Sequence, residues 1–307
     1  MDLSGRSFLT LADFTADEIT AVLDLADELK RERGAGVRRD THVGKTLALL
    51  FQKPSLRTRV SFDVAMHELG GDALYLGPDE VGIGTRESIA DVAAVLSRYV
   101  HGIAARVFGH DLVEKLVEYG DVPVINGLSD LLHPCQVLAD LMTVRERFGK
   151  FDGLTLVYVG DGNNVAHSLM LGGAIMGLNV TIVTPAGFAP AAEIASRARR
   201  LAAKTGAQIA VGHDVAAARG ADVLYTDVWA SMGEEEVAAR KKQAFAGFTV
   251  DADMVAAAAP HAVVLHCLPA HYGEEITEDV ARGPQSAIWD EAENRLHAQK
   301  ALLAMLL

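Results

Sequence analysis

A short segment with two hydroxyl side chains and two arginines could bind a phosphate group. The segment QKPSLRTR, residues 52–59, follows the apolar run TLALLF and precedes the helical pattern VSFDVAMHELGG. This order places Ser55, Arg57 and Thr58 at a helix N-terminus, where free backbone N–H groups and the helix dipole favour an anion. Basic residues normally favour the last turn of a helix, so Arg57 and Arg59 predict an anion at the first turn. The glycine spacing of a P-loop is missing, and a capped helix with a solvated first turn is the alternative.

Two further groups could complete such an anion site. Arg106 lies near the end of the apolar run GIAARVF, an unusual position for a charge, although a strand-end arginine can also simply reach solvent. The tetrapeptide HPCQ, residues 133–136, starts a helical pattern, and proline suits the first helical position. His133 would then precede the helix, where it could donate a hydrogen bond to a carbonyl oxygen while Gln136 binds an amide. An ordinary turn is the alternative interpretation of this tetrapeptide.

Polar residues after two later apolar runs suit a small ligand with an amino group. The tetrapeptide DGNN, residues 161–164, follows LTLVYVG, but Val165 stands where a dinucleotide fingerprint has glycine or alanine. The pair Asn163 and Asn164 therefore suits polar recognition of a small ligand better than dinucleotide binding. Asp227 ends the run DVLYTDV shortly before Ser231 and Met232, and a strand-end carboxylate there could bind an ammonium group or cap the next turn.

Cys267 follows His266 in the run AVVLHCL, and this pair could be taken for a nucleophile with its base. Neighbouring residues on a strand point to opposite faces, so the two side chains cannot form a dyad directly. A polar contact or a backbone carbonyl at the ligand site is the better functional interpretation of this turn. A buried structural cysteine is the alternative.

All of these residues follow short apolar runs that alternate with helical patterns. That alternation predicts an α/β fold with parallel sheets, and ligands bind such sheets at the carboxyl ends of the strands. We predict two doubly wound parallel-sheet domains, at residues 1–147 and 148–307, with a C-terminal helix over about 288–307 that could pack back on the first domain. The expected strands cover residues 46–51, 73–76, 102–108, 122–127, 154–162, 180–183, 208–211, 222–228 and 262–268.

Composition narrows the classes of function. The chain has 307 residues, half of them hydrophobic, and 28 lysines and arginines against 41 acidic residues give a formal charge of −13. The apolar content excludes a disordered chain, and the acidic balance lacks the basic footprint of a nucleic-acid or anionic-membrane binder. No apolar run approaches the roughly 20 residues that cross a bilayer, and no secretory signal is visible. Two cysteines without zinc-site spacing indicate the cytoplasm.

Four motifs in this order resemble the aspartate/ornithine carbamoyltransferase superfamily. They are PSLRTR, HPCQ, DVWASMG and HCLPAH, with WDEAENRLHAQK as a fifth block, and the resemblance covers nearly the whole chain. PSxRTR and HPxQ mark the broader superfamily, whereas SMG and HCLP point to ornithine as the acceptor. The resemblance therefore implies transfer of a carbamoyl group to the δ-amine of ornithine, in arginine metabolism and amino-acid biosynthesis.

The resemblance also implies a role for individual residues. Carbamoyl phosphate would be bound by Ser55, Leu56 through its backbone, Arg57, Thr58, Arg106, His133, Gln136, Cys267, Leu268 and Arg295. Ornithine would be bound by Asn164, Asp227, Ser231 and Met232. The catalytic residues would be Arg57, Arg106, His133 and Cys267. The superfamily further implies no metal, no organic cofactor, and a homotrimer or a multiple of trimers.

Two positions depart from the superfamily pattern. Leu56 stands where threonine is usual, so only its backbone N–H is available, and Gly82 stands where a glutamine often reaches the neighbouring subunit's site.

The expected mechanism is direct attack of the neutral amine on the carbonyl carbon, with no covalent enzyme intermediate. A transferase for another amine such as putrescine, and a catalytically silent relative, are the rival hypotheses.

Overall fold

The structure is a computed structural model, and it describes every residue except 1, 84–85 and 231–234. The chain divides into two compact units, one formed by residues 1–139 with 293–307 and the other by residues 140–292. Each unit is built on its own parallel sheet, as the alternating pattern predicts. In the described part of the chain, no helix combines the length and apolarity that a bilayer crossing requires.

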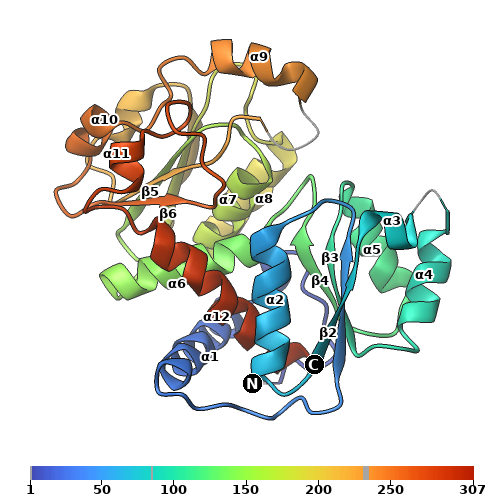
Figure 1. The fold of residues 1–307 in the computed structure, drawn as a ribbon. Helices are drawn as coiled ribbons and strands as arrows, with labels where there is room; N and C mark the ends of the chain where they lie inside the picture. The colour runs from blue at the N-terminus through green and yellow to red at the C-terminus, as the bar shows by residue number, and fades with distance from the viewer. Residues whose placement is uncertain (1, 84–85, 231–234) are drawn as a thin grey trace. The chain divides into compact units, whose positions relative to one another are not determined.

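The first unit contains a four-stranded parallel sheet in the order β2-β1-β3-β4. Its strands are β1 Thr46–Phe51, β2 Asp72–Leu76, β3 Gly102–Arg106 and β4 Val124–Leu128. Its helices are η1 Leu11–Asp13, α1 Ala16–Gly34, α2 Leu56–Glu68, α3 Pro78–Val81, α4 Ile89–Leu96 and α5 His110–Tyr119. Figure 1 shows α4 and α5 beside one face of this sheet and α2 on the other. Both faces are thus covered, which explains why β1 is apolar and buried from Leu47 to Phe51.

The second unit contains a five-stranded parallel sheet in the order β7-β6-β5-β8-β9. Its strands are β5 Thr155–Val159, β6 Asn179–Val183, β7 Ile209–Gly212, β8 Val223–Thr226 and β9 Val263–His266. Its helices are α7 Asn164–Met176, α8 Ala192–Ala202, η2 Val215–Ala218, α9 Glu235–Ala244, α10 Ala252–Ala257 and α11 Glu278–Ala281. The apolar core on one face includes Val157, Leu224 and Val264 from three adjacent strands.

Two longer helices, α6 Pro134–Phe148 and α12 Ile288–Leu306, have residues in both units. Within the first unit, α12 is tied to the N-terminal helices by polar contacts. The Lys300 ammonium donates to Glu68 of α2 at 2.8 Å, and Lys30 of α1 donates to Asn294 at 2.7 Å. The C-terminal helix therefore packs back on helices from the start of the chain, as predicted.

Several expected strands are longer than the observed ones at their carboxyl ends. The run at 102–108 ends as a strand at Arg106, and the run at 262–268 ends at His266. In both cases, the residues that follow the strand belong to the loop at the carboxyl edge of the sheet. The candidate site residues therefore lie at strand ends or just beyond them.

Candidate active site

The predicted anion cradle lies at the start of α2, where the structure shows a capped helix N-terminus. Ser55 is the N-cap residue, and its hydroxyl accepts a hydrogen bond from the Thr58 backbone N–H at 3.3 Å while donating to the Thr58 hydroxyl at 3.2 Å. Leu56 is the first helical residue and its side chain is 76% exposed, so only its backbone can serve a ligand at the helix end. Arg57 is half-buried in the same turn. Arg59 instead stacks its guanidinium over the Tyr75 ring at 3.9 Å, which accounts for it without a ligand.

Arg106 is a buried cation at the carboxyl end of β3. Its side chain is 8% exposed, and in the sheet it pairs with Phe51 at the end of β1. The register with β4 shifts between Ala105 and Arg106. Irregularities of this kind redirect the side chain at a strand end. The burial and the shift together favour a site residue over an arginine that merely reaches solvent.

His133 lies among guanidinium groups just before α6, which begins at Pro134 as predicted. It is 5% exposed, and burial lowers its pKa well below the usual value. The positive charges of Arg295, Arg106 and Arg57 lower that pKa further. The imidazole is therefore neutral at pH 7 and can donate a hydrogen bond without carrying a charge.

Arg295 of α12 connects the cradle to α6. Its guanidinium donates to the Gln136 side-chain oxygen at 2.7 Å and to the Thr58 hydroxyl at 3.4 Å. All three side chains are buried. The first unit thus brings together residues that are 237 positions apart, in a site with the charge and donors to bind an anion and polarise a carbonyl.

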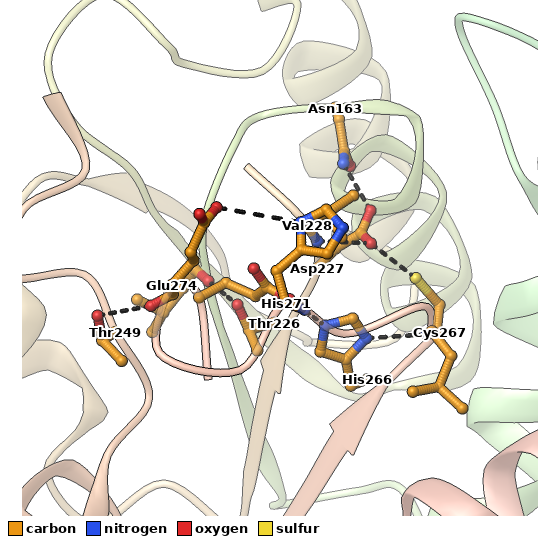
Figure 2. A network of polar contacts seen from close by, with 12 residues as sticks. Asn163, Thr226, Asp227, Val228, Thr249, His266, Cys267, His271 and Glu274 are labelled. Atoms are coloured by element: carbon orange, nitrogen blue, oxygen red, sulfur yellow. Dashed lines mark hydrogen bonds and ion pairs between the residues drawn. The ribbon is translucent and has the colours of Figure 1, made fainter. Parts of the chain in front are cut away.

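The second unit contains a cluster of opposite character, centred on the Asp227 carboxylate directly after β8. Asp227 is 5% exposed, and its oxygens accept from the Asn163 amide at 2.8 Å, the Val228 backbone N–H at 2.8 Å and the Cys267 thiol at 2.9 Å (Figure 2). These partners come from the ends of three neighbouring strands, β5, β8 and β9. A carboxylate held in this way can pair with a ligand ammonium group.

Asn163, to which the family resemblance gave no role, contacts Asp227. Its side-chain oxygen caps α7 by accepting from the backbone N–H groups of Val165 and Ala166, while its amide nitrogen donates to Asp227. Asn164 is the first residue of α7 and is half-buried. Asparagine is a favoured N-cap, so the strand–Asn–helix pattern could have identified Asn163 as the capping residue.

Cys267 and His266 contact different partners, in agreement with the alternation expected along a strand. Burial and the Asp227 carboxylate raise the pKa of the Cys267 thiol well above its usual value, so it remains a protonated donor at neutral pH. The His266 ring accepts from the Leu268 N–H at 2.8 Å and contacts the Glu275 carboxylate at 3.1 Å. Leu268 has a φ of 58°, in the left-handed region, and the His266 ring holds its backbone there.

Two fully buried glutamates support this cluster, and the sequence analysis gave neither of them a role. Glu275 also accepts from the His271 backbone N–H at 2.6 Å. Glu291 accepts from the His266 backbone N–H at 2.8 Å and from the Tyr225 hydroxyl at 3.1 Å. Burial raises the pKa of Glu291 well above its usual value, and the neighbouring Asp140 raises it further. Glu291 lies in the WDEAENR block, the only signal that the sequence offered for it.

Three predicted residues, Ser231, Met232 and Gly82, lie in or near segments that the structure does not describe. Ser231 and Met232 lie outside the described residues. Gly82 follows the short helix α3 with a φ of 60°, a conformation that suits glycine. Residues 84–85, in the loop after it, lie outside the described residues.

Within the described residues, Asp227, His266 and Cys267 place three ligand-type atoms within 4.8 Å of one another, as a metal site would. Both ring nitrogens of His266 already have partners, and the thiol donates to Asp227. A metal at this position would have to displace these contacts.

Comparison with known protein families shows which family the chain belongs to. Residues 6–146 match the carbamoyl-P binding domain of aspartate/ornithine carbamoyltransferase, and residues 152–306 match the Asp/Orn binding domain. The chain belongs to the aspartate/ornithine carbamoyltransferase family. Membership confirms the resemblance that the four motifs carry.

Relatives within this carbamoyltransferase family match along the whole chain. An ornithine carbamoyltransferase from Acidothermus cellulolyticus is 56% identical over 98% of this chain and 96% of its own length. An anabolic ornithine carbamoyltransferase from Pyrococcus furiosus is 52% identical over 100% and 98%. A solved structure of ornithine carbamoyltransferase from that organism matches with a TM-score of 0.97 at 51% identity, covering 100% and 98% of the two chains.

Proposed function

We propose that this chain transfers the carbamoyl group of carbamoyl phosphate to the δ-amine of L-ornithine, giving L-citrulline and phosphate. The observation that carries the proposal is the set of three guanidinium groups, Arg57, Arg106 and Arg295, around a neutral histidine. Such a set fits a phosphate whose neighbouring carbonyl needs a hydrogen-bond donor. The full-length identity to ornithine carbamoyltransferases supports the same reaction.

Residues 1–147 are assigned to carbamoyl phosphate. Ser55, the Leu56 backbone and Thr58 present hydroxyls and N–H groups at the start of α2. Guanidinium groups add the strong charge-assisted donors that phosphate oxygens accept. The proposed set from this range is Ser55, Leu56, Arg57, Thr58, Arg106, His133 and Gln136, and the later part of the chain adds Cys267, Leu268 and Arg295.

Residues 148–307 are assigned to ornithine. Asp227 is positioned by three hydrogen bonds and would pair with the α-ammonium group of the amino acid. The family pattern adds Asn164 as a polar contact, together with Ser231 and Met232 from the SMG motif. Putrescine lacks both the ammonium group at this position and the carboxylate, so ornithine is the better match.

The proposed chemistry is direct transfer. The neutral δ-amine forms the new C–N bond, the C–O bond to phosphate breaks, and phosphate leaves with the electron pair and accepts the amine proton. Negative charge develops on the carbonyl oxygen, where His133, Arg57 and Arg106 act as donors, each worth about 2.7–4 kcal/mol in sites of this type. Cys267 remains a thiol that holds Asp227, which supports a mechanism without a carbamoylated cysteine.

Assembly and location follow the family. We propose a homotrimer or a multiple of trimers, and a cytoplasmic location for a chain whose two cysteines are both free thiols. The anabolic relative supports a place in amino-acid biosynthesis.

A colour assay for the ureido product with several acceptors tests the proposal. L-Ornithine should give citrulline, whereas putrescine, L-lysine and Nα-acetylornithine should give little product. Turnover of putrescine at the ornithine rate would contradict the assignment of Asp227, and no product with any acceptor would contradict the activity itself.

A further inference from the structure

Gln299 is a fully buried amide one helical turn after Arg295 on α12. The orientation of this amide is assigned from its neighbours, and the assigned orientation turns its oxygen towards donors and its nitrogen towards acceptors. In this orientation the side-chain oxygen accepts from the Arg295 guanidinium at 2.9 Å. Its side-chain nitrogen donates to the Ser61 hydroxyl and to the Arg295 backbone carbonyl, the latter at 3.2 Å. The amide therefore connects the guanidinium to α2, the helix that carries the anion cradle.

The contacts extend without a break into the cradle. The Ser61 hydroxyl that receives the Gln299 amide donates in turn to the Thr58 backbone carbonyl at 3.2 Å. The Thr58 hydroxyl and the Gln136 side-chain oxygen accept from the same guanidinium that Gln299 contacts. All of these atoms belong to the first unit, and every residue named is buried.

The chemistry of these partners explains why an amide suits this position. An arginine side chain has many rotamers, and ordering it carries an entropic cost that fixed acceptors reduce when they form before the ligand arrives. The hydroxyl of Thr58 and the amides of Gln136 and Gln299 are neutral acceptors. They can fix the plane of the guanidinium without cancelling its charge, which stays available to an anion.

We propose that Gln299 is a positioning residue that holds the Arg295 guanidinium in place for carbamoyl phosphate. This inference rests on the proposed function. It assigns a role to a residue that contacts no substrate and acts only through Arg295 and Ser61.

The test is Gln299→Met, which keeps the length of the side chain and removes its polar atoms. KM for carbamoyl phosphate should rise about tenfold, the size expected for one hydrogen bond to a charged group. KM for ornithine, measured at saturating carbamoyl phosphate, should stay within about twofold of the wild type, since the contacts described for Gln299 are to Ser61 and Arg295 of the first unit. Gln299→Glu should raise KM for carbamoyl phosphate further, because its carboxylate would neutralise Arg295.

Lys300→Met is the matched control. Lys300 is the next residue on α12, is equally buried and donates to Glu68 rather than to Arg295. This variant should lower the melting temperature and leave both KM values unchanged. A Gln299→Met enzyme with the wild-type KM for carbamoyl phosphate, or with both KM values raised equally, would overturn the inference.

Ser61→Ala provides the answer if Gln299→Met does not fold, because it loosens the Gln299 amide without touching Arg295. It should raise KM for carbamoyl phosphate by a smaller factor in the same direction, and an unchanged value would count against the inference. Titration with inorganic phosphate tests the role of Gln299 in anion binding independently of whether the chain forms citrulline. If the wild type forms no citrulline, the proposed function fails, whereas weaker phosphate binding by Gln299→Met would still support the role of Gln299.

Discussion

The two units use the same architecture to build sites of opposite charge. In the first unit, three guanidinium groups lie around His133 and lower its pKa, in addition to the effect of burial. In the second, burial and the Asp227 carboxylate raise the pKa of Cys267, with further contributions from Glu291 and Asp140. Burial alone shifts both groups towards their neutral forms, and the charges of each unit add to that shift.

This contrast shows what a parallel sheet contributes and what it leaves open. In both units the site residues follow strand ends, where helix N-termini and loops converge. The sheet fixes that location, but the side chains after each strand fix the sign of the field. One architecture can therefore receive an anionic phosphate and a cationic ammonium group in its two copies.

The largest expected effect is the loss of a cation from the first unit. Arg57→Ala should lower turnover about 10²–10³-fold, the cost of removing one donor from a developing oxyanion. Because Arg57 is half-buried at a helix end, the melting temperature should hardly change. Arg59→Ala is the control from the same turn, since Arg59 stacks on Tyr75, and steady-state kinetics should leave it within about twofold of the wild type. Near-normal turnover of Arg57→Ala would refute the phosphate assignment.

The corresponding change in the second unit removes its anion. Asp227→Asn should raise KM for ornithine by about 10–100-fold, as expected when a charged hydrogen-bond partner is lost, with carbamoyl phosphate binding nearly unchanged. Calorimetric titration with each substrate would measure this directly. Asp222→Asn is a suitable control because that carboxylate binds the Thr155 backbone N–H and His261 instead. Equal weakening of both substrates would make Asp227 a structural residue.

The pKa of His133 predicts a pH-dependent difference in stability. A histidine whose pKa is lower in the folded than in the unfolded state binds fewer protons when folded, so its contribution is present above about pH 6.5 and declines as the pH falls. Relative to His133→Asn, the wild-type free energy of unfolding should fall by about 1.4 kcal/mol per pH unit below 6.5. Urea unfolding of both proteins at several pH values would measure this difference, and parallel curves would mean that folding does not lower the pKa of His133.

The smallest effect is expected for Cys267→Ser, because a hydroxyl can still donate to Asp227. Turnover should fall by less than about tenfold, within the range for exchanging one neutral hydrogen bond. Rapid-quench measurement of phosphate without ornithine should reveal no burst in the wild type. A burst that disappears in Cys267→Ser would instead establish a carbamoylated cysteine and reverse the interpretation of the raised thiol pKa.

Much of the site was visible in the sequence because its signals are local. Ser55 before a helical pattern predicted the capped cradle, and Pro134 predicted where α6 begins. Apolar runs of strand length identified both sheets, since strands covered on both faces are mainly apolar. Strand alternation separated His266 from Cys267, and their contacts in the structure agree.

The tertiary structure decided which distant residues meet. Asn163 contacts Asp227 across a separation of 64 residues, because its side chain caps α7 at the end of the sheet where β8 also ends. Glu291 reaches the end of β9 from 25 residues away, and Gln299 reaches Ser61 across an even longer separation in the chain. Composition and periodicity report only on neighbours within one element. Contacts between elements depend on helix docking and side-chain direction, so only the folded chain brings together the amides and carboxylates that support each site.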